Sequence, residues 1–362
     1  MTRAEQDRLD KLRLIRSAKI GPVSYVQLIQ RFGTAAAALE ALPQLAARGG
    51  GSPPRMATEA EVRAEITRVE DLGARHIFLD DKDYPPLLRE MEGAPPALIA
   101  RGDTQLAHKP SVALVGARNA SAAACRFARG LAADLARQGI VIVSGLARGI
   151  DTQAHIGALD SGTIGVIANG INIAYPPENA ELQEKMAVSG LILTEYPPGR
   201  EPLARHFPAR NRIIAGLARG TVVVEAAPKS GSLITARLAA EAGRDVMAVP
   251  GSPLDPRAQG CNQLIREGAI LVQAATDIIE QIQIFDNYIS QKVSRIEEPR
   301  EAVHPDDFAR QIIISLLSPV PVLVDELVRQ SGLPVGVVHM LLLELDLAGR
   351  LERHAGGRVS LS

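Results

Sequence analysis

The sequence has few of the residues that build disulfide frameworks and metal sites. Its 362 residues include two cysteines, Cys125 and Cys261, no tryptophan, and only 3% aromatic residues. Two cysteines exclude a disulfide framework, and no histidines stand beside them at the spacing of zinc ligands. We therefore expect neither a metal nor a structural disulfide.

Long apolar runs and an excess of charge of one sign are also missing. No apolar stretch reaches the length of a membrane span, and residues 1–11 are too polar for a signal peptide, so we expect a cytoplasmic protein without a membrane segment. The formal net charge is −1, from 40 basic and 41 acidic residues. A surface that binds nucleic acid would therefore be a local basic patch, offset by acidic regions elsewhere.

The order of sequence patterns predicts three domains and one linker, since a chain of this length exceeds what one core usually organises. Residues 1–75 have helical spacing and predict a small helical domain of the SAM or helix-hairpin-helix type. The turn at 20–23 lacks the second glycine of a phosphate-binding hairpin, which favours plain helix packing there. Residues 76–285 form the main domain, 286–304 a polar linker, and 305–362 a winged-helix domain of three helices and a terminal hairpin.

Seven short apolar runs in the main domain predict a parallel sheet. The runs alternate with helical stretches, and continuous apolar strands of this kind are covered on both faces. The fold class is therefore α/β, a Rossmann-like doubly wound parallel sheet flanked by the helical and winged-helix domains. The runs are 112–115, 140–143, 164–167, 191–194, 222–225, 246–249 and 270–272.

The loops after the first five of these strands contain the residues expected to bind phosphate. Such loops meet at one edge of a parallel sheet, where helix N-termini and free amides face a ligand. Glycine permits close backbone approach, serine donates hydrogen bonds, and arginine supplies a planar charged fork. The predicted DNA- or phosphate-binding residues are Gly116, Arg118, Asn119, Ser144, Gly145, Arg148, Gly149, Phe207, Arg210, Asn211, Arg212, Lys229, Ser230, Gly231, Ser232 and Thr235.

Each of these loops also has an ordinary structural explanation. A glycine turn can be a tight connection, and Ser230 can simply cap its helix. Asp151 and His155 lie four residues apart, where a local hydrogen bond is more common than an acid–base pair. Arg210 and Arg212 can be ordinary salt-bridge partners of Glu195 or Glu225. Phe207 can pack in the core as readily as it stacks a base. The same chemistry in five successive loops is what favours a phosphate-bearing ligand.

The motifs of nucleotide cofactors are missing from these loops. A dinucleotide site needs G-x-G-x-x-G in the first turn and an acidic residue ending the second strand, but here Gly116 is followed by Arg118, and the second strand ends in Ser144 and Gly145. No phosphate-binding P-loop motif occurs either. Several separated basic loops fit an extended phosphodiester better than one pyrophosphate, with Phe207 as a platform for an unstacked base.

The same loops resemble the DNA-processing protein A (DprA, or Smf) family. This resemblance implies a single-stranded DNA binding protein of DNA processing and natural transformation (competence), which protects incoming DNA and helps load RecA recombinase. It also implies a homodimer through the Rossmann domain, no chemical reaction and no cofactor. The matching stretches, between about 105 and 275, are 116–118, 144–151, 175–179, 195–198, 207–216, 223–226, 230–236, 249–251 and 260–265.

The resemblance also implies roles for single residues. Arg118 would hold phosphates with Ser144, Gly145 and Arg148 beside it, and Phe207 would stack a base near Arg210, Asn211 and Arg212. Two positions depart from the family pattern. Ala117 replaces the usual serine, and the lysine that some members place before the phenylalanine appears as Arg205 or is missing at Ala204.

An enzyme of related fold is the main alternative, a nucleotide N-glycosidase (phosphoribohydrolase) that acts on nucleoside monophosphates. Glu225 or Asp151 would assist that reaction, but residues 229–235 stand where those enzymes have a Pro-Gly-Gly-x-Gly-Thr loop. A third possibility is an interaction scaffold whose basic edge binds an acidic protein.

The helix that would read duplex DNA in the winged-helix domain, 334–348, contains no lysine or arginine and carries Glu344 and Asp346. Groove readers need hydrogen-bond donors at this place, so we expect the helix to pack against protein. Basic residues lie only around the wing, where they could touch a DNA backbone. They are Arg350, Arg353, His354 and Arg358.

Overall fold

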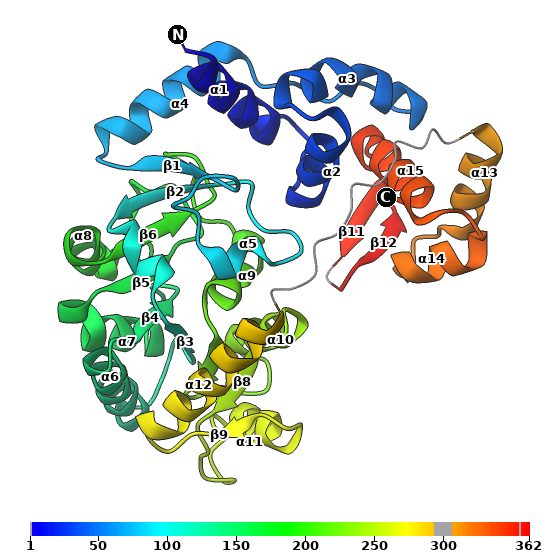
Figure 1. Cartoon of the computed structure of the whole chain (residues 1–362). Coiled ribbons are helices and arrows are strands. Elements are labelled where there is room, and N and C mark those ends of the chain that lie inside the picture. Colours follow the sequence, from blue (N-terminus) through cyan, green and yellow to red (C-terminus); the bar gives the residue numbers. More distant parts are fainter. Residues whose placement is uncertain (1, 293–305, 355) are drawn as a thin grey trace. The chain divides into compact units, whose positions relative to one another are not determined.

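The computed structural model describes residues 2–292, 306–354 and 356–362, and the chain divides into two compact units (Figure 1). Residues 65–295 make up the sheet unit. Residues 1–64 and 296–362 together make up the second, terminal unit. The predicted linker falls largely on residues 293–305, which lie outside the described residues.

The sheet unit is built on one mostly parallel sheet, in which the described residues supply nine strands in the order β1-β2-β6-β5-β4-β3-β7-β8-β9. Strands β3 to β9 are parallel and lie at the seven predicted runs, whereas β1 and β2, which were not predicted, run antiparallel at the edge beside β6. The strands are β1 (Arg75–Phe78), β2 (Ala97–Gly102), β3 (Ser111–Val115), β4 (Val141–Ser144), β5 (Thr163–Val166), β6 (Leu191–Thr194), β7 (Gly220–Val223), β8 (Asp245–Ala248) and β9 (Ile270–Leu271).

Strand β3 lies at the point where the order of the sheet reverses. Val112 pairs with Ile142 of β4 on one side and with Gly220 of β7 on the other. In open α/β sheets, ligands bind beyond the carboxyl ends of the strands at such a switch point. The loops after β3, β4 and β7 therefore start where a ligand is expected.

Helices cover both faces of this sheet, as a doubly wound fold requires (Figure 1). Val112 and Leu114 of β3 pack with α6, α7 and α12, whereas Ala113 and Val115 pack with α5, α9, α10 and α11 on the opposite face. The helices of this unit are α4 (Glu59–Asp71, which begins in the terminal unit), α5 (Pro86–Arg89), α6 (Ala122–Arg137), α7 (Ile150–Ala158), α8 (Ala180–Ser189), α9 (His206–Leu217), α10 (Gly231–Glu241), α11 (Gln259–Arg266) and α12 (Ala275–Lys292), with short 3₁₀ turns η1 (Thr104–His108), η2 (Leu159–Ser161) and η3 (Pro177–Asn179).

The terminal unit combines the predicted helical and winged-helix parts. The N-terminal part begins with helices α1 to α3, and α1 starts with a capping box between Thr2 and Glu5. The C-terminal part is a winged helix, with three helices and a small sheet of strand order β10-β12-β11. The elements are α1 (Arg3–Arg16), α2 (Pro22–Phe32), α3 (Ala35–Arg48), α13 (Asp307–Leu316), β10 (Val322–Leu323), α14 (Val324–Ser331), α15 (Val335–Ala348), β11 (Leu351–His354) and β12 (Arg358–Leu361).

Candidate nucleic-acid interface

The loops after β3 and β7 meet at the switch point and are joined there by hydrogen bonds to Glu225. The backbone amide of Ala117 donates to the Glu225 carbonyl oxygen at 2.6 Å. The Glu225 side chain accepts hydrogen bonds from the Ser121 amide at 3.0 Å and the Ser121 hydroxyl at 2.8 Å. Ser121 is the N-cap of α6, so the chain's own carboxylate occupies the place where a dinucleotide phosphate would bind.

The loop after β4 packs against the loop after β3 through glycine. Gly149 has a φ of +75°, and a β-carbon on it would lie 2.2 Å from the Ala117 carbonyl oxygen. A side chain is therefore unfavourable here both for the backbone conformation and for space. The next amide, of Ile150, donates to the same oxygen at 3.3 Å. These contacts fix the two loops to each other.

An arginine and two aromatic rings, from two loops and the start of a helix, gather at this edge. Arg118 is exposed after β3, and its guanidinium carbon lies 5.1 Å from the centroid of the half-buried Phe207 ring at the start of α9. The Tyr175 ring, from the loop after β5, lies 5.7 Å from the Phe207 ring and is 41% exposed. Asn119 is exposed next to Arg118. A cation and exposed ring surface thus lie side by side.

Arg148, in the loop after β4, is exposed and pairs with a carboxylate from the next loop. Its Nη2 lies 2.5 Å from Glu178 Oε1, and both side chains are more than half exposed. Exposed ion pairs of this kind contribute at most about 1 kcal/mol. A phosphate group could therefore replace Glu178 at low cost.

The structure places Arg210 under the edge instead of on it. The side chain is 4% exposed, and Nη1 donates to the Val166 carbonyl oxygen at 2.9 Å. A β-carbon on Gly145 would lie 1.6 Å from this Nη1. Burial lowers the pKa of Arg210 to about 10, although the nearby Asp151 carboxylate acts in the opposite direction. Arg210 thus supports the loop after β4 from below.

Asp151 and His155 each make local hydrogen bonds. This agrees with the structural explanation of their spacing. Asp151 accepts from the amides of Gly145 at 3.1 Å and Ala147 at 3.4 Å, and burial raises its pKa while Arg210 opposes that shift. His155 is bonded through Nδ1 to the Thr163 hydroxyl at 2.9 Å. Both side chains are buried on α7.

Arg212 and Asn211 contact neighbouring segments of the same unit. Arg212 donates to the Gly93 carbonyl oxygen at 2.6 Å and to Glu195 at 2.5 Å, and the Asn211 amide lies 3.5 Å from the Gly231 carbonyl oxygen. Arg212 therefore forms the ion pair that was the alternative to ligand binding.

In the loop before α10 and in the first turns of that helix, the predicted residues divide between surface and interior. Lys229 and Gly231 are exposed, whereas Ser232 and Thr235 are buried. Ser230 caps α10 by accepting from the Ser232 amide at 3.4 Å. Ser144, the last residue of β4, is also buried, and its hydroxyl donates to the Leu114 carbonyl oxygen at 2.6 Å.

Three side chains at this edge were not in the predicted set. Tyr175 follows β5 in the stretch 175–179, whose match to the family pattern was the available signal. Arg200 and Arg205 are exposed in the loop after β6. Desolvation is the main cause that lowers the pKa of His206, and the positive charges of these two arginines lower it further. The available sequence signal for the two arginines was their place in the loop that follows a predicted strand.

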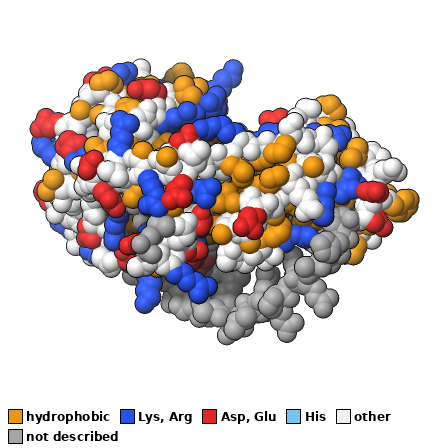
Figure 2. Space-filling model, turned by 90° about the horizontal axis from the view of Figure 1, so that it is seen from above, with side chains coloured by type: hydrophobic (Ala, Val, Ile, Leu, Met, Phe, Trp, Pro, Cys, Tyr) orange, Lys and Arg blue, Asp and Glu red, His pale blue; other side chains and the backbone are white. Residues whose placement is uncertain are grey.

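Figure 2 shows basic and acidic side chains interspersed over one face of the molecule. This agrees with the net charge of −1 and with a basic site that is local.

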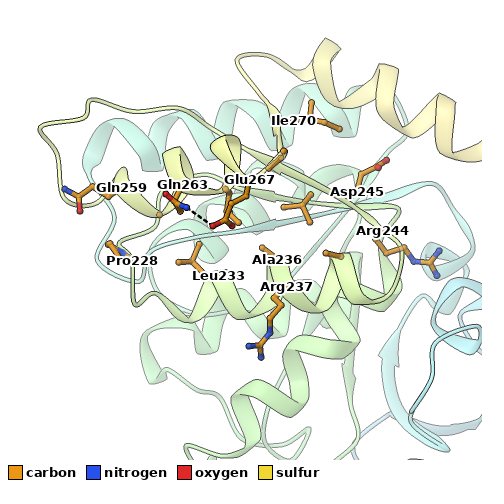
Figure 3. A pocket seen from close by; sticks show the side chains of 16 residues that line it. Pro228, Leu233, Ala236, Arg237, Arg244, Asp245, Gln259, Gln263, Glu267 and Ile270 are labelled. Atoms are coloured by element: carbon orange, nitrogen blue, oxygen red, sulfur yellow. Dashed lines mark hydrogen bonds between the residues drawn. The ribbon is translucent and has the colours of Figure 1, made fainter. Parts of the chain in front are cut away.

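A cavity of about 880 Å³ lies elsewhere in the sheet unit, between α10, α11 and β8 (Figure 3). Leu233 and Ala236 of α10 line it opposite Gln263 of α11, whose amide donates to Glu267 at 2.7 Å. The predicted phosphate-binding residues do not contribute to its lining. The cavity and the candidate interface are distinct features.

Within the described residues, the helices do not combine the length and apolar character that crossing a membrane requires.

Comparison with known proteins gives one consistent family for the whole chain. Residues 75–283 match the family described as DNA recombination-mediator protein A, 5–67 match a DprA-like N-terminal HHH domain, and 297–357 match a DprA winged helix domain. DNA processing protein DprA of Streptococcus pneumoniae is 48% identical over 208 residues, which are 57% of this chain and 73% of that protein.

Solved structures agree with these matches. The crystal structure of DprA from Streptococcus pneumoniae has a TM-score of 0.64 and 35% identity, over 77% of this chain and 98% of that one. DNA processing protein A from Helicobacter pylori, described for its unique single-stranded DNA binding mode, has a TM-score of 0.51 and 31% identity, over 60% of this chain and 96% of that one. The chain belongs to the DNA recombination-mediator protein A (DprA) family.

Proposed function

We propose that this protein binds single-stranded DNA at the edge of the sheet unit and acts there as a mediator of DNA recombination. The binding edge consists of Arg118, Arg148, Tyr175 and Phe207. The observation that carries the proposal is the contact between Arg118 and Phe207, which places a phosphate-binding cation beside a ring that can stack a base. The described binding of single-stranded DNA by the Helicobacter pylori relative supports it.

The rings favour a single strand over a duplex. A base can lie on the face of an aromatic ring only when it is unstacked from its neighbours, as in single-stranded DNA. Stacking tolerates any base, so we expect little sequence preference. Phosphate contacts through Arg118 and Arg148 make the binding sensitive to salt.

We propose binding without a chemical reaction. The carboxylate that would assist a nucleotide N-glycosidase is Glu225 or Asp151. Glu225 accepts a hydrogen bond from the Ser121 amide in the loop after β3, and Asp151 accepts one from the Gly145 amide in the loop before its own helix. Incubation of the protein with nucleoside monophosphates tests this point, and release of free base would contradict it.

We further propose that the bound DNA is protected and passed to RecA recombinase by a homodimer formed through the sheet unit. Membership of the family supports both ideas. The test for RecA is the rate at which RecA assembles on single strands that carry a competing single-strand binding protein, with and without this chain. Sedimentation in the absence of DNA tests the dimer.

The central experiment is a titration of a fluorescent oligothymidine, followed by anisotropy at several salt concentrations. We expect binding to the single strand to be tighter than to a duplex of equal length and to weaken steeply with salt. Equal affinity for duplex and single strand would contradict the proposal.

A further inference from the structure

Helix α15 of the winged helix, labelled in Figure 1, contributes apolar residues to two different clusters from two opposite faces. One face supplies Val338, Leu341 and Leu345 to the core of the winged helix itself. The other supplies Met340, Leu343 and Leu347 to a cluster of the N-terminal helices. That cluster includes Leu14, Tyr25, Leu28, Leu42 and Leu45. The two terminal parts of the chain thus share one core helix.

Two glycines after α3 allow the backbone of α15 to approach closely. A β-carbon on Gly49 would lie 2.0 Å from the Glu344 carbonyl oxygen, and one on Gly51 would lie 2.5 Å from the Ala348 carbonyl oxygen. Gly49 has a φ of −71°, which any residue adopts, so the neighbouring helix and not the backbone conformation disfavours a side chain at Gly49. The lack of side chains at Gly49 and Gly51 therefore lets this stretch pack directly against the backbone of α15.

Polar contacts surround this apolar contact. The Ser24 hydroxyl donates to Asp346 Oδ2 at 2.7 Å, and Arg350 Nη1 donates to the Gly49 carbonyl oxygen at 3.2 Å. The side-chain amide nitrogen Nε2 of Gln27 lies 3.3 Å from His339 Nδ1. An apolar centre with hydrogen bonds at its rim is the usual composition of a specific protein interface.

We propose that the winged-helix domain is a protein-binding module whose partner is the N-terminal helical domain of the same chain, with α15 as its binding surface. The helix that enters the major groove in DNA-binding relatives of this motif is here enclosed by protein on both sides. It is therefore closed to duplex DNA in the folded chain. The proposal concerns the terminal unit and is independent of the proposed binding of single strands.

The test uses cross-linking within the full chain. Gln27→Cys and His339→Cys are combined with Cys125→Ser and Cys261→Ala, and the protein is treated at high dilution with a short bis-maleimide. We expect a rapid cross-link inside one chain, identified by mass. Absence of the product, or a product that joins two chains, overturns the proposal.

Two variants and one control test whether the rate of cross-linking depends on the contact between α3 and α15. Gly51→Leu and Met340→Lys are each expected to slow the reaction by about tenfold or more, because they insert bulk or charge between α3 and α15. Gly336→Ala is the control, since a β-carbon there meets no atom within 4 Å. Circular dichroism confirms that each chain is folded. An unchanged rate in either folded variant overturns the proposal.

Discussion

The guanidinium carbon of Arg118 lies 5.1 Å from the centroid of the Phe207 ring. Arg118 comes from the loop after β3 and Phe207 from the first turn of α9. A contact between a cation and an aromatic face at an exposed site is worth about 0.5–1 kcal/mol. In the proposed interface, the pair holds the proposed phosphate-binding group beside the proposed base-stacking group before any DNA arrives. Preorganisation of this kind lowers the entropic cost of binding.

Replacement of Arg118 by glutamine is expected to weaken binding of oligothymidine. The negative slope of log affinity against log salt is expected to become shallower by about 0.7, because one phosphate contact on a single strand is lost. Anisotropy titrations over a salt series measure both quantities. Arg137→Gln is the control, because Arg137 is an exposed arginine at the end of α6, where it pairs with Asp134. An unchanged slope in the Arg118 variant would remove this residue from the interface.

Replacement of Phe207 by alanine is expected to cost about 1–3 kcal/mol of binding free energy, the usual contribution of one stacked base. Phe308→Ala is the matched control, since Phe308 is 71% exposed and lies in the terminal unit. The measurement is the affinity for oligothymidine, with thermal unfolding to show that the variant is folded. A folded Phe207 variant with normal affinity would show that the ring has only a packing role.

Replacement of Gly145 by alanine is expected to destabilise the sheet unit by about 1–3 kcal/mol, since the new methyl group meets the buried Arg210 guanidinium. Gly130→Ala, in the middle of α6 with no atom within 4 Å of its β-carbon, is instead expected to stabilise the unit by about 0.5–1 kcal/mol. Urea unfolding measures both variants. Equal stability of the two variants would mean that Arg210 does not support the loop after β4.

Burial of His155 makes the stability of the sheet unit depend on pH. Burial lowers the pKa of His155 from 6.5 to about 3, with a smaller contribution from Arg210. Between these two values the unfolded chain binds a proton that the folded chain does not, so the free energy of unfolding falls as the pH falls, by at most about 1.4 kcal/mol per pH unit.

His155→Asn isolates this effect. The Thr163 hydroxyl donates to the Ile142 carbonyl oxygen at 2.7 Å, so it accepts from His155 Nδ1, and asparagine retains a donor near that position. The stability advantage of the wild-type chain over the variant is expected to shrink from pH 6.5 downward. A difference that stays constant with pH would show that His155 is not buried in its neutral form.

The sequence was sufficient to predict the parallel strands but not the antiparallel edge. Continuous apolar runs mark strands that are buried on both faces, which is why β3 to β9 were recognised. Strand β2 contains two alanines, an arginine and a glycine, which have low strand propensity or break the apolar pattern. Strand β1 begins with an arginine and a histidine, so it has no continuous apolar run. Strand β2 is stabilised by pairing with β6, and β1 by pairing with β2, and these tertiary contacts leave no local signal.

The sequence also identified the loops of the candidate site but not the direction of each side chain. Phe207, Arg210 and Asn211 lie within one turn of α9, and spacing alone does not decide which of them faces the sheet. The close approach of Gly145 directs Arg210 inward, and Glu195 holds Arg212. Both contacts join segments far apart in the chain, so only the folded structure reveals them.

The most direct test of the proposed DNA interface is a crystal structure of the protein with a short oligothymidine. We expect a phosphate group within hydrogen-bonding distance of Arg118 and a thymine ring stacked on Phe207. A strand bound only in the cavity between α10 and α11, or only on the terminal unit, would contradict the account.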